Sequence, residues 1–272
     1  MASPSHPTKP ARMKQNCFLF YLSCLAAGLF VVALFRHLGQ DTAFLLQSKP
    51  VTYLNGSFEQ VALKYGTDKV TTHNYQLMYE KYMSPFRNLP IKMLEIGLGC
   101  NMVLITDYGP GASYHTWLEY LSHVNLYFIE YDARCANKYR DKAVNAQVYV
   151  GDQADVAFLE QVVADTTTEG LFDIIIDDGG HTMEQQTTSL EHLWPVVKPG
   201  GLYVIEDLQT SYWPDYGGDP STRNPAKHTT MKYLYELLDD MMIKRDSKPV
   251  SHDLLSVECM AEICALRKRY ES

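Results

Sequence analysis

One short segment of this 272-residue chain combines acids and a histidine directly after an apolar run. In IIIDDGGHTMEQQ, residues 174–186, three isoleucines are followed by Asp177, Asp178 and, three residues later, His181. Packing alone gives no reason for an apolar strand to end in so much charge. Imidazole is the natural general base for an alcohol near neutral pH. The segment is therefore expected to form part of a catalytic site.

A second acidic pair, Glu206 and Asp207, ends the apolar segment GLYVIED. In a doubly wound sheet this strand lies beside the one that ends at Asp177, so the four carboxylates crowd together and repel unless a cation or protons neutralise them. Oxygen ligands from two or three side chains are typical of a Mg²⁺ site. The predicted metal ligands are Asp178, Glu206 and Asp207, with Asp177 supporting them. The alternative is that some of these acids cap helices or pair with Lys or Arg.

A cofactor crevice is predicted at the same edge of the sheet. A G-x-G turn follows the first predicted strand, and glycines there let a ligand approach the backbone. An acid at the tip of the second strand can accept both hydroxyls of a ribose, and one after the third can meet an adenine amino group. The third glycine of a nicotinamide fingerprint, expected near Met102, is absent. The candidate cofactor contacts are Glu95, Gly97, Gly99, Glu130, Asp152 and Gln153.

The elements that must position these residues alternate between strands and helices. This alternation predicts a doubly wound, Rossmann-like α/β domain with a parallel sheet, and the segment 254–269 predicts an antiparallel closing hairpin. A helical stripe of Leu190, Leu193, Trp194 and Val197 leads to a tight turn at 198–201. The long aromatic loop 209–227 is expected to line an acceptor site. Strands are predicted at 91–96, 125–131, 146–150, 171–177 and 201–206, and further helices from Ser57, at 74–84 and at 229–242.

The N-terminal part differs in character from the rest. Residues 17–35 carry no charge and are long enough for a transmembrane helix, and the charged residues that precede them are all basic. We expect a type II signal-anchor with the catalytic domain in the secretory lumen or outside, and Asn55 then begins a usable glycosylation sequon. The alternative is a cleaved signal peptide. The expected organisation is a cytoplasmic tail (1–16), a transmembrane signal-anchor (17–36), a stem (37–56) and a catalytic domain (57–272).

Charge and cysteine content limit the partners. The net charge of the chain is −8, and all charged residues among the first 36 are basic, so the remainder is more acidic than the whole chain. This acidic charge makes nucleic acid an improbable substrate. Four of the six cysteines lie beyond the predicted anchor, at spacings that match no metal finger. Either disulfides or buried free thiols are compatible with these spacings.

Four motifs together resemble one known family. GDQAD, IIIDDGGHTMEQQ, KPGGLYVIEDLQTSYW and YGTDKVTTHNY look like the metal-dependent sugar O-methyltransferases that modify macrolide antibiotics, a group within the class I S-adenosylmethionine-dependent methyltransferases. The resemblance covers about residues 60–268. It implies that Asp178, Glu206 and Asp207 bind the metal and that His181 is the base. It also places Glu95, Gly97, Glu130 and Asp152 on S-adenosylmethionine, and 65–69 and His73 where the family closes over cofactor or acceptor.

The leading hypothesis is a membrane-anchored O-methyltransferase. It would use S-adenosylmethionine and Mg²⁺ or a similar divalent cation to methylate a hydroxyl of a sugar or related small molecule. The sequence leaves its oligomeric state open. The alternatives are an NAD-type Rossmann oxidoreductase and a non-catalytic, membrane-tethered scaffold with the same fold.

Overall fold

The computed structural model describes residues 56–100, 110–140 and 142–270. They belong to one compact unit, Leu54–Ser272. The predicted tail and signal-anchor, the stem up to residue 55 and the sequon at Asn55 lie outside the described residues. Within the described ranges, no helix has both the length and the apolar character of a membrane span.

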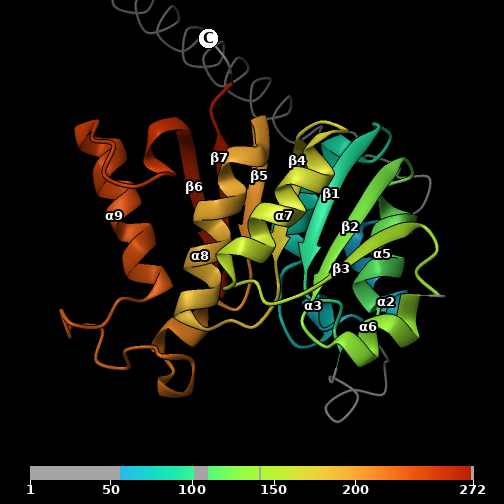
Figure 1. Ribbon diagram of the computed structural model, residues 1–272, viewed down its shortest axis with the longest axis horizontal. Coiled ribbons are helices and arrows are strands. Elements are labelled where there is room, and N and C mark those ends of the chain that lie inside the picture. Colours follow the sequence, from blue (N-terminus) through green and yellow to red (C-terminus); the bar gives the residue numbers. More distant parts are fainter. Residues whose placement is uncertain (1–55, 101–109, 141, 271–272) are drawn as a thin grey trace, which may run out of the picture. The chain divides into compact units, whose positions relative to one another are not determined.

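A seven-stranded sheet forms the centre of this unit, in the order β3-β2-β1-β4-β5-β7-β6 (Figure 1). Neighbouring strands from β3 to β5 pair in parallel, whereas β7 is antiparallel to both β5 and β6. The predicted doubly wound sheet and its closing hairpin are both confirmed. The strands are β1 (Ile91–Ile96), β2 (Val124–Glu130), β3 (Ala146–Val150), β4 (Phe172–Asp177), β5 (Val197–Ile205), β6 (Leu254–Met260) and β7 (Ile263–Lys268).

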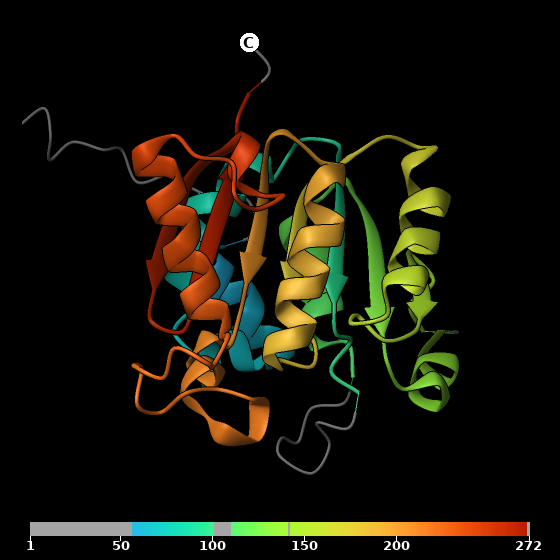
Figure 2. The same cartoon turned by 60° about the vertical axis from the view of Figure 1, so that its left-hand side comes forward.

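Helices cover both faces of the sheet, and every residue of β1 is accordingly buried. On one face, Phe58 of α2 packs against Tyr79 of α4 and Trp117 of α5, with ring centroids 4.9 and 5.4 Å away. The other face is covered by α7, α8 and α9 (Figures 1 and 2). The helices are α2 (Phe58–Tyr65), α3 (Asp68–Thr71), α4 (Gln76–Met83), α5 (Ala112–Tyr120), α6 (Ala133–Arg140), α7 (Val156–Thr167), α8 (Met183–Leu193) and α9 (Thr230–Ile243).

Several boundaries differ from the predictions by one or two residues, and the start of β5 differs by four. Helix α8 ends at Leu193 because Pro195 turns the chain into the 3₁₀ segment Trp194–Val196. Val197, predicted to be helical, instead begins β5 and pairs with Phe172, so the predicted turn at 198–201 lies within this strand. Strand β2 ends at Glu130, one residue earlier than predicted.

Four cysteines form two disulfides in the described part of the chain. Cys100, after β1, is bonded to Cys135 in α6. Cys259 and Cys264 are paired residues on β6 and β7, so their disulfide links the two strands of the closing hairpin. This decides between the disulfides and free thiols that the sequence left open.

Strand register brings the predicted site residues to one edge of the sheet. Ile96 on β1 pairs with Asp177 on β4, which pairs in turn with Ile205 on β5. The next residues along the three strands, Gly97, Asp178 and Glu206, therefore leave the sheet side by side. The segment after β5, orange in Figure 2, passes below this same edge.

Candidate functional site

A cavity of about 600 Å³ opens at the carboxyl ends of β1, β2, β3 and β4. Two sequence-predicted site residues, Glu95 and Glu206, do not line it, because both are buried below its floor. The predicted residues that do line it are Gly97, Gly99, Glu130, Asp152, Gln153, Asp178, His181 and Asp207.

Gly97 and Glu130 shape the part of the cavity next to β1. Gly97 has φ +98°, and a Cβ atom there would lie 2.0 Å from the Asp178 carbonyl oxygen, so only glycine allows the two strand ends to approach this closely. The Glu130 carboxylate accepts backbone N–H groups from Leu98 at 3.0 Å and Asp132 at 2.8 Å. These bonds fix the acid at the tip of β2, where it was predicted to meet a ribose.

Gln153 connects the loops that follow β3 and β4. Its amide donates to Asp177 Oδ1 at 2.9 Å, and its carbonyl oxygen accepts the Gly180 N–H at 2.8 Å. Asp177 is fully buried and also accepts a hydrogen bond from Ser189. Asp177 therefore supports the loop of Asp178 from behind, the role inferred for it from the sequence.

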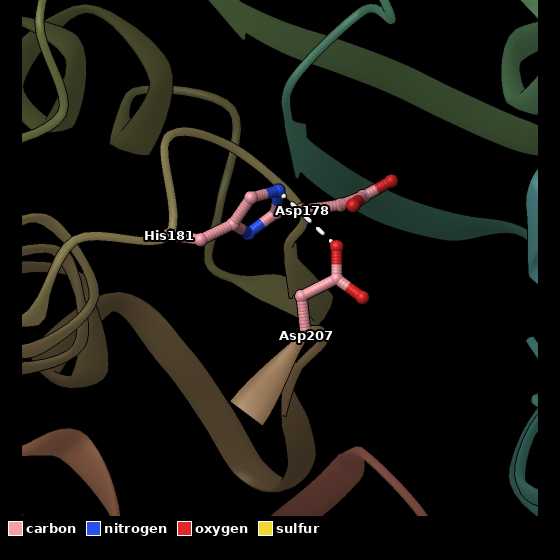
Figure 3. A group of neighbouring side chains, drawn as sticks. All are labelled: Asp178, His181 and Asp207. Atoms are coloured by element: carbon pink, nitrogen blue, oxygen red, sulfur yellow. Dashed lines mark ion pairs between the residues drawn. The ribbon is translucent and has the colours of Figure 1, made fainter. Parts of the chain in front are cut away.

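Asp178, His181 and Asp207 form the centre of the site (Figure 3). One potential ligand atom from each lies within 4.8 Å of the others, and His181 Nε2 is 3.3 Å from Asp207 Oδ2. Both His181 and Asp207 have positive φ, +59° and +54°, an uncommon conformation outside glycine that clusters at functional sites. The other ring nitrogen of His181, Nδ1, is buried without a hydrogen-bond partner.

Asp207 is held by aromatic side chains from the segment after α3. The Tyr75 hydroxyl donates to Asp207 Oδ1 at 2.7 Å, and His73 Nε2 lies 3.5 Å from the same oxygen. Burial raises the pKa of Asp207, but His181 and the Tyr75 hydrogen bond outweigh burial and keep this pKa below its usual value. Asp207 is thus an ionised acceptor beside His181.

A buried ammonium group lies under the cavity. Lys69 Nζ is 2.5 Å from Asp178 Oδ2, 2.7 Å from Glu206 Oε1 and 3.3 Å from Glu95 Oε1. Burial would lower the pKa of Lys69, but these carboxylates outweigh burial and raise it well above normal. Three acids around one lysine still leave excess negative charge. Burial raises the pKa of Glu95 to about 7; Lys69 opposes this rise, and the negative charge of Asp178 adds to it.

The described residues fit a divalent cation at one place. Asp178 and Asp207 offer carboxylate oxygens at the cavity surface, and His181 lies beside them. Hard oxygen donors with surplus negative charge match Mg²⁺ or a similar ion. The Glu206 side chain instead contacts Lys69 and Tyr79, so its role as a ligand stays a prediction.

Sequence reasoning missed several residues that hold the site together. The YGTDK motif drew attention to the segment around Lys69, but nothing in it indicated an amine buried among three acids. Glu95 accepts hydrogen bonds from Ser113 and Trp117, both at 2.9 Å, and so anchors α5 below the cavity rather than lining it.

Comparison with known proteins identifies the domain. Residues 107–208 match a family model described as a methyltransferase domain. The chain carries a class I methyltransferase domain. It is 27% identical to MycE, a methyltransferase of mycinamycin biosynthesis whose structure contains Mg, SAH and mycinamycin VI; the TM-score is 0.69 over 80% of this chain and 56% of MycE.

The curated relatives that the chain matches are named as O-methyltransferases. The chain is 36% identical over 183 residues to an 8-demethyl-8-alpha-L-rhamnosyl tetracenomycin-C 2'-O-methyltransferase of Streptomyces olivaceus, covering 66% of this chain and 44% of that protein. It is 33% identical over 217 residues to the demethylmacrocin O-methyltransferase of Streptomyces fradiae, covering 76% and 52%. The chain thus spans about half the length of the curated relatives it matches. These relatives favour the methyltransferase over the oxidoreductase alternative.

Proposed function

We propose that this protein is an O-methyltransferase that uses S-adenosylmethionine and a divalent cation to methylate a sugar hydroxyl. The observation that carries the proposal is the placement of Asp178, His181 and Asp207 at one end of a cavity that also contains the glycine turn and Glu130. Relatives named as sugar O-methyltransferases support the acceptor class.

Each side chain then has a definite task. Asp178 and Asp207 hold the cation, and Glu130 and Asp152 meet the hydroxyls and amino group of the cofactor. When bound, the cofactor supplies an electrophilic methyl group and the cation lowers the pKa of the acceptor hydroxyl. His181 would take the proton of the acceptor hydroxyl during methyl transfer. Asp207 orients the imidazole, with His181 Nε2 3.3 Å from Asp207 Oδ2.

Binding and transfer test this proposal separately. Calorimetry on the full-length protein should show S-adenosylmethionine binding in the presence of Mg²⁺. Transfer of a labelled methyl group to methyl α-L-rhamnopyranoside and other methyl glycosides should follow, and EDTA should stop it. Absence of cofactor binding would sink the enzymatic proposal, whereas binding without transfer to any sugar would favour the scaffold alternative.

We also propose that the segment 17–36 anchors the protein in a membrane with the methyltransferase domain on the lumenal or outer side. Two features support this topology: the charge pattern before residue 17, and the disulfides Cys100–Cys135 and Cys259–Cys264, which persist in oxidising compartments. Protease treatment of intact microsomes tests it. The domain should be protected until detergent is added; digestion without detergent contradicts the topology.

A further inference from the structure

A second cavity, of about 710 Å³, shares a lining residue, Tyr216, with the cavity at the strand ends. Tyr216 lines both cavities, and its ring centroid is 6.4 Å from that of His181. The second cavity continues from Thr182, the residue after His181, between α8 and α9. It contains none of the glycine turn or the strand-tip acids that mark the cofactor side. A molecule that presents a hydroxyl to His181 can therefore extend into it.

The second cavity is lined by the buried phenol Tyr233, which lies beside Glu191. Tyr233 is 9% exposed, and its hydroxyl has no hydrogen-bond partner of suitable distance and angle. Burial raises the pKa of Tyr233, and the neighbouring Glu191 raises it further, so the phenol remains a protonated donor. A buried polar group without a partner is costly, which indicates that a ligand or water satisfies it.

The charged groups around Tyr233 select the kind of ligand. Both lysines are already paired, Lys232 with Asp219 at 3.0 Å and Lys248 with Glu236 at 2.6 Å. Glu184 and Glu191 have no ion-pair partner in the described part of the chain, and the Glu191 carboxylate lies next to the Tyr233 phenol. An anion would be repelled here, whereas a neutral molecule with several hydroxyl groups would satisfy both acids and the phenol.

One aromatic ring, that of Tyr216, belongs to the lining of both cavities. Tyr216 packs beside Trp213, with centroids 5.9 Å apart, and Trp213 is 48% exposed in the segment that follows β5. The Tyr216 ring and the carboxylates of Glu184 and Glu191 in the same cavity match the two surfaces of a pyranose, its apolar C–H face and its hydroxyl edge. This combination favours a sugar over a purely apolar aglycone.

We infer that the second cavity binds the sugar next to the one that is methylated, so that the acceptor is an oligosaccharide with its terminal residue at His181. This inference rests on the proposed function and names its substrate class more closely. Glu191 and Tyr233 are the residues that bind the second sugar.

Matched acceptors test the inference. The probes are methyl α-L-rhamnopyranoside and its α-1,2-linked disaccharide, and the corresponding mannose pair. With full-length protein, the disaccharide of an accepted pair should have a KM about tenfold lower than its monosaccharide, which corresponds to one or two added hydrogen bonds. Tyr233→Phe and Glu191→Gln should each reduce this advantage to about twofold. Glu160→Gln, an exposed acid on α7, is the control and should keep it.

Saturation-transfer NMR with S-adenosylhomocysteine and Mg²⁺ separates this inference from the proposed function. Both rings of a bound disaccharide should receive saturation from the wild type, and the second ring should lose it in Tyr233→Phe. If both rings receive saturation but no methyl group is transferred, the second cavity is confirmed as a sugar site and the proposed chemistry is overturned. The inference would be overturned by methyl transfer to a disaccharide whose second ring receives no saturation. Equal KM values for the disaccharide and monosaccharide, or no binding of any probe, would overturn it as well.

Discussion

The ammonium group of Lys69 lies 2.7 Å from the carboxylate of Glu206, although 137 residues separate them in the chain. The same ammonium contacts Asp178, which links the segment after α2 to the ends of β4 and β5. The buried lysine thus stabilises a cluster of acids that would otherwise repel one another, and it fixes Asp178 at the cavity surface.

Replacing Lys69 by Met should destabilise the protein strongly. Removing one partner of a buried ionic cluster leaves uncompensated charge and costs about 3–5 kcal/mol. Urea unfolding of the full-length protein measures this free energy. Lys64→Met is the matched control, because Lys64 pairs with Glu119 at the exposed surface and its loss should leave the unfolding midpoint unchanged. Equal effects of the two substitutions would contradict the stabilising role of Lys69.

His181→Ala should lower kcat by about 10²–10⁴-fold, the usual contribution of a general base. Binding of S-adenosylmethionine should persist, because the cofactor contacts lie on the other strand ends. Methyl transfer to an accepted glycoside and calorimetry with the cofactor give the two readouts. The control is His123→Ala, an exposed histidine before β2. Normal turnover by His181→Ala would remove the base assignment and leave the cofactor site intact.

Metal binding should depend on the carboxylates at the cavity surface. Asp178→Asn and Asp207→Asn should each weaken Mn²⁺ binding by at least about tenfold, because each removes a charged ligand. Electron paramagnetic resonance counts free Mn²⁺ directly. Glu206→Gln is informative in the same titration. An equally large loss would mean that Glu206 leaves Lys69 and joins the ion, and unchanged Mn²⁺ affinity in all three variants would contradict the metal site.

The sheet could be predicted because its strands are continuous apolar segments that end in turns or charges. The predicted strands agree with the structure except at their ends. The start of β5 was missed because Gly200 and Gly201 are typical of a turn, and only pairing with β4 shows that the strand begins before them. Tertiary pairing, which local pattern does not contain, decides such boundaries.

The grouping of Asp178, His181 and Asp207 could also be predicted, since neighbouring parallel strands end at the same edge. The positions of Lys69 and Tyr75 could not. They lie on the short segments around α3, whose place against the sheet depends on packing of α2 and α4 rather than on any periodic pattern. Glu95 shows the same limit, because its hydrogen bonds to Ser113 and Trp117 could not be foreseen from the sequence, and its contact with the cofactor stays a prediction.

A pH-dependent contribution to stability is expected from Asp240 at the end of α9. This buried carboxylate accepts hydrogen bonds from the Ser247 N–H at 3.0 Å and from the Ser251 hydroxyl at 2.6 Å, and it pairs with Arg245 at 2.6 Å. The hydrogen bonds from Ser247 and Ser251, opposed by burial and helped by Arg245, lower the pKa of Asp240. Ionised Asp240 therefore holds the loop that leads from α9 to β6.

Because the folded-state pKa is depressed, the stabilisation is fully present above the unfolded-state value, about pH 4, and is lost as the pH falls through the folded-state pKa. Asp240→Asn should lower the free energy of unfolding at pH 7, and its difference from wild type should shrink steadily below pH 4. Denaturant unfolding at pH 7, 4 and 3 measures this convergence. Asp239→Asn, at the exposed neighbouring position, should match wild type throughout. A difference between Asp240→Asn and wild type that stays constant with pH would show that the lost hydrogen-bond geometry, not the charge of Asp240, is responsible.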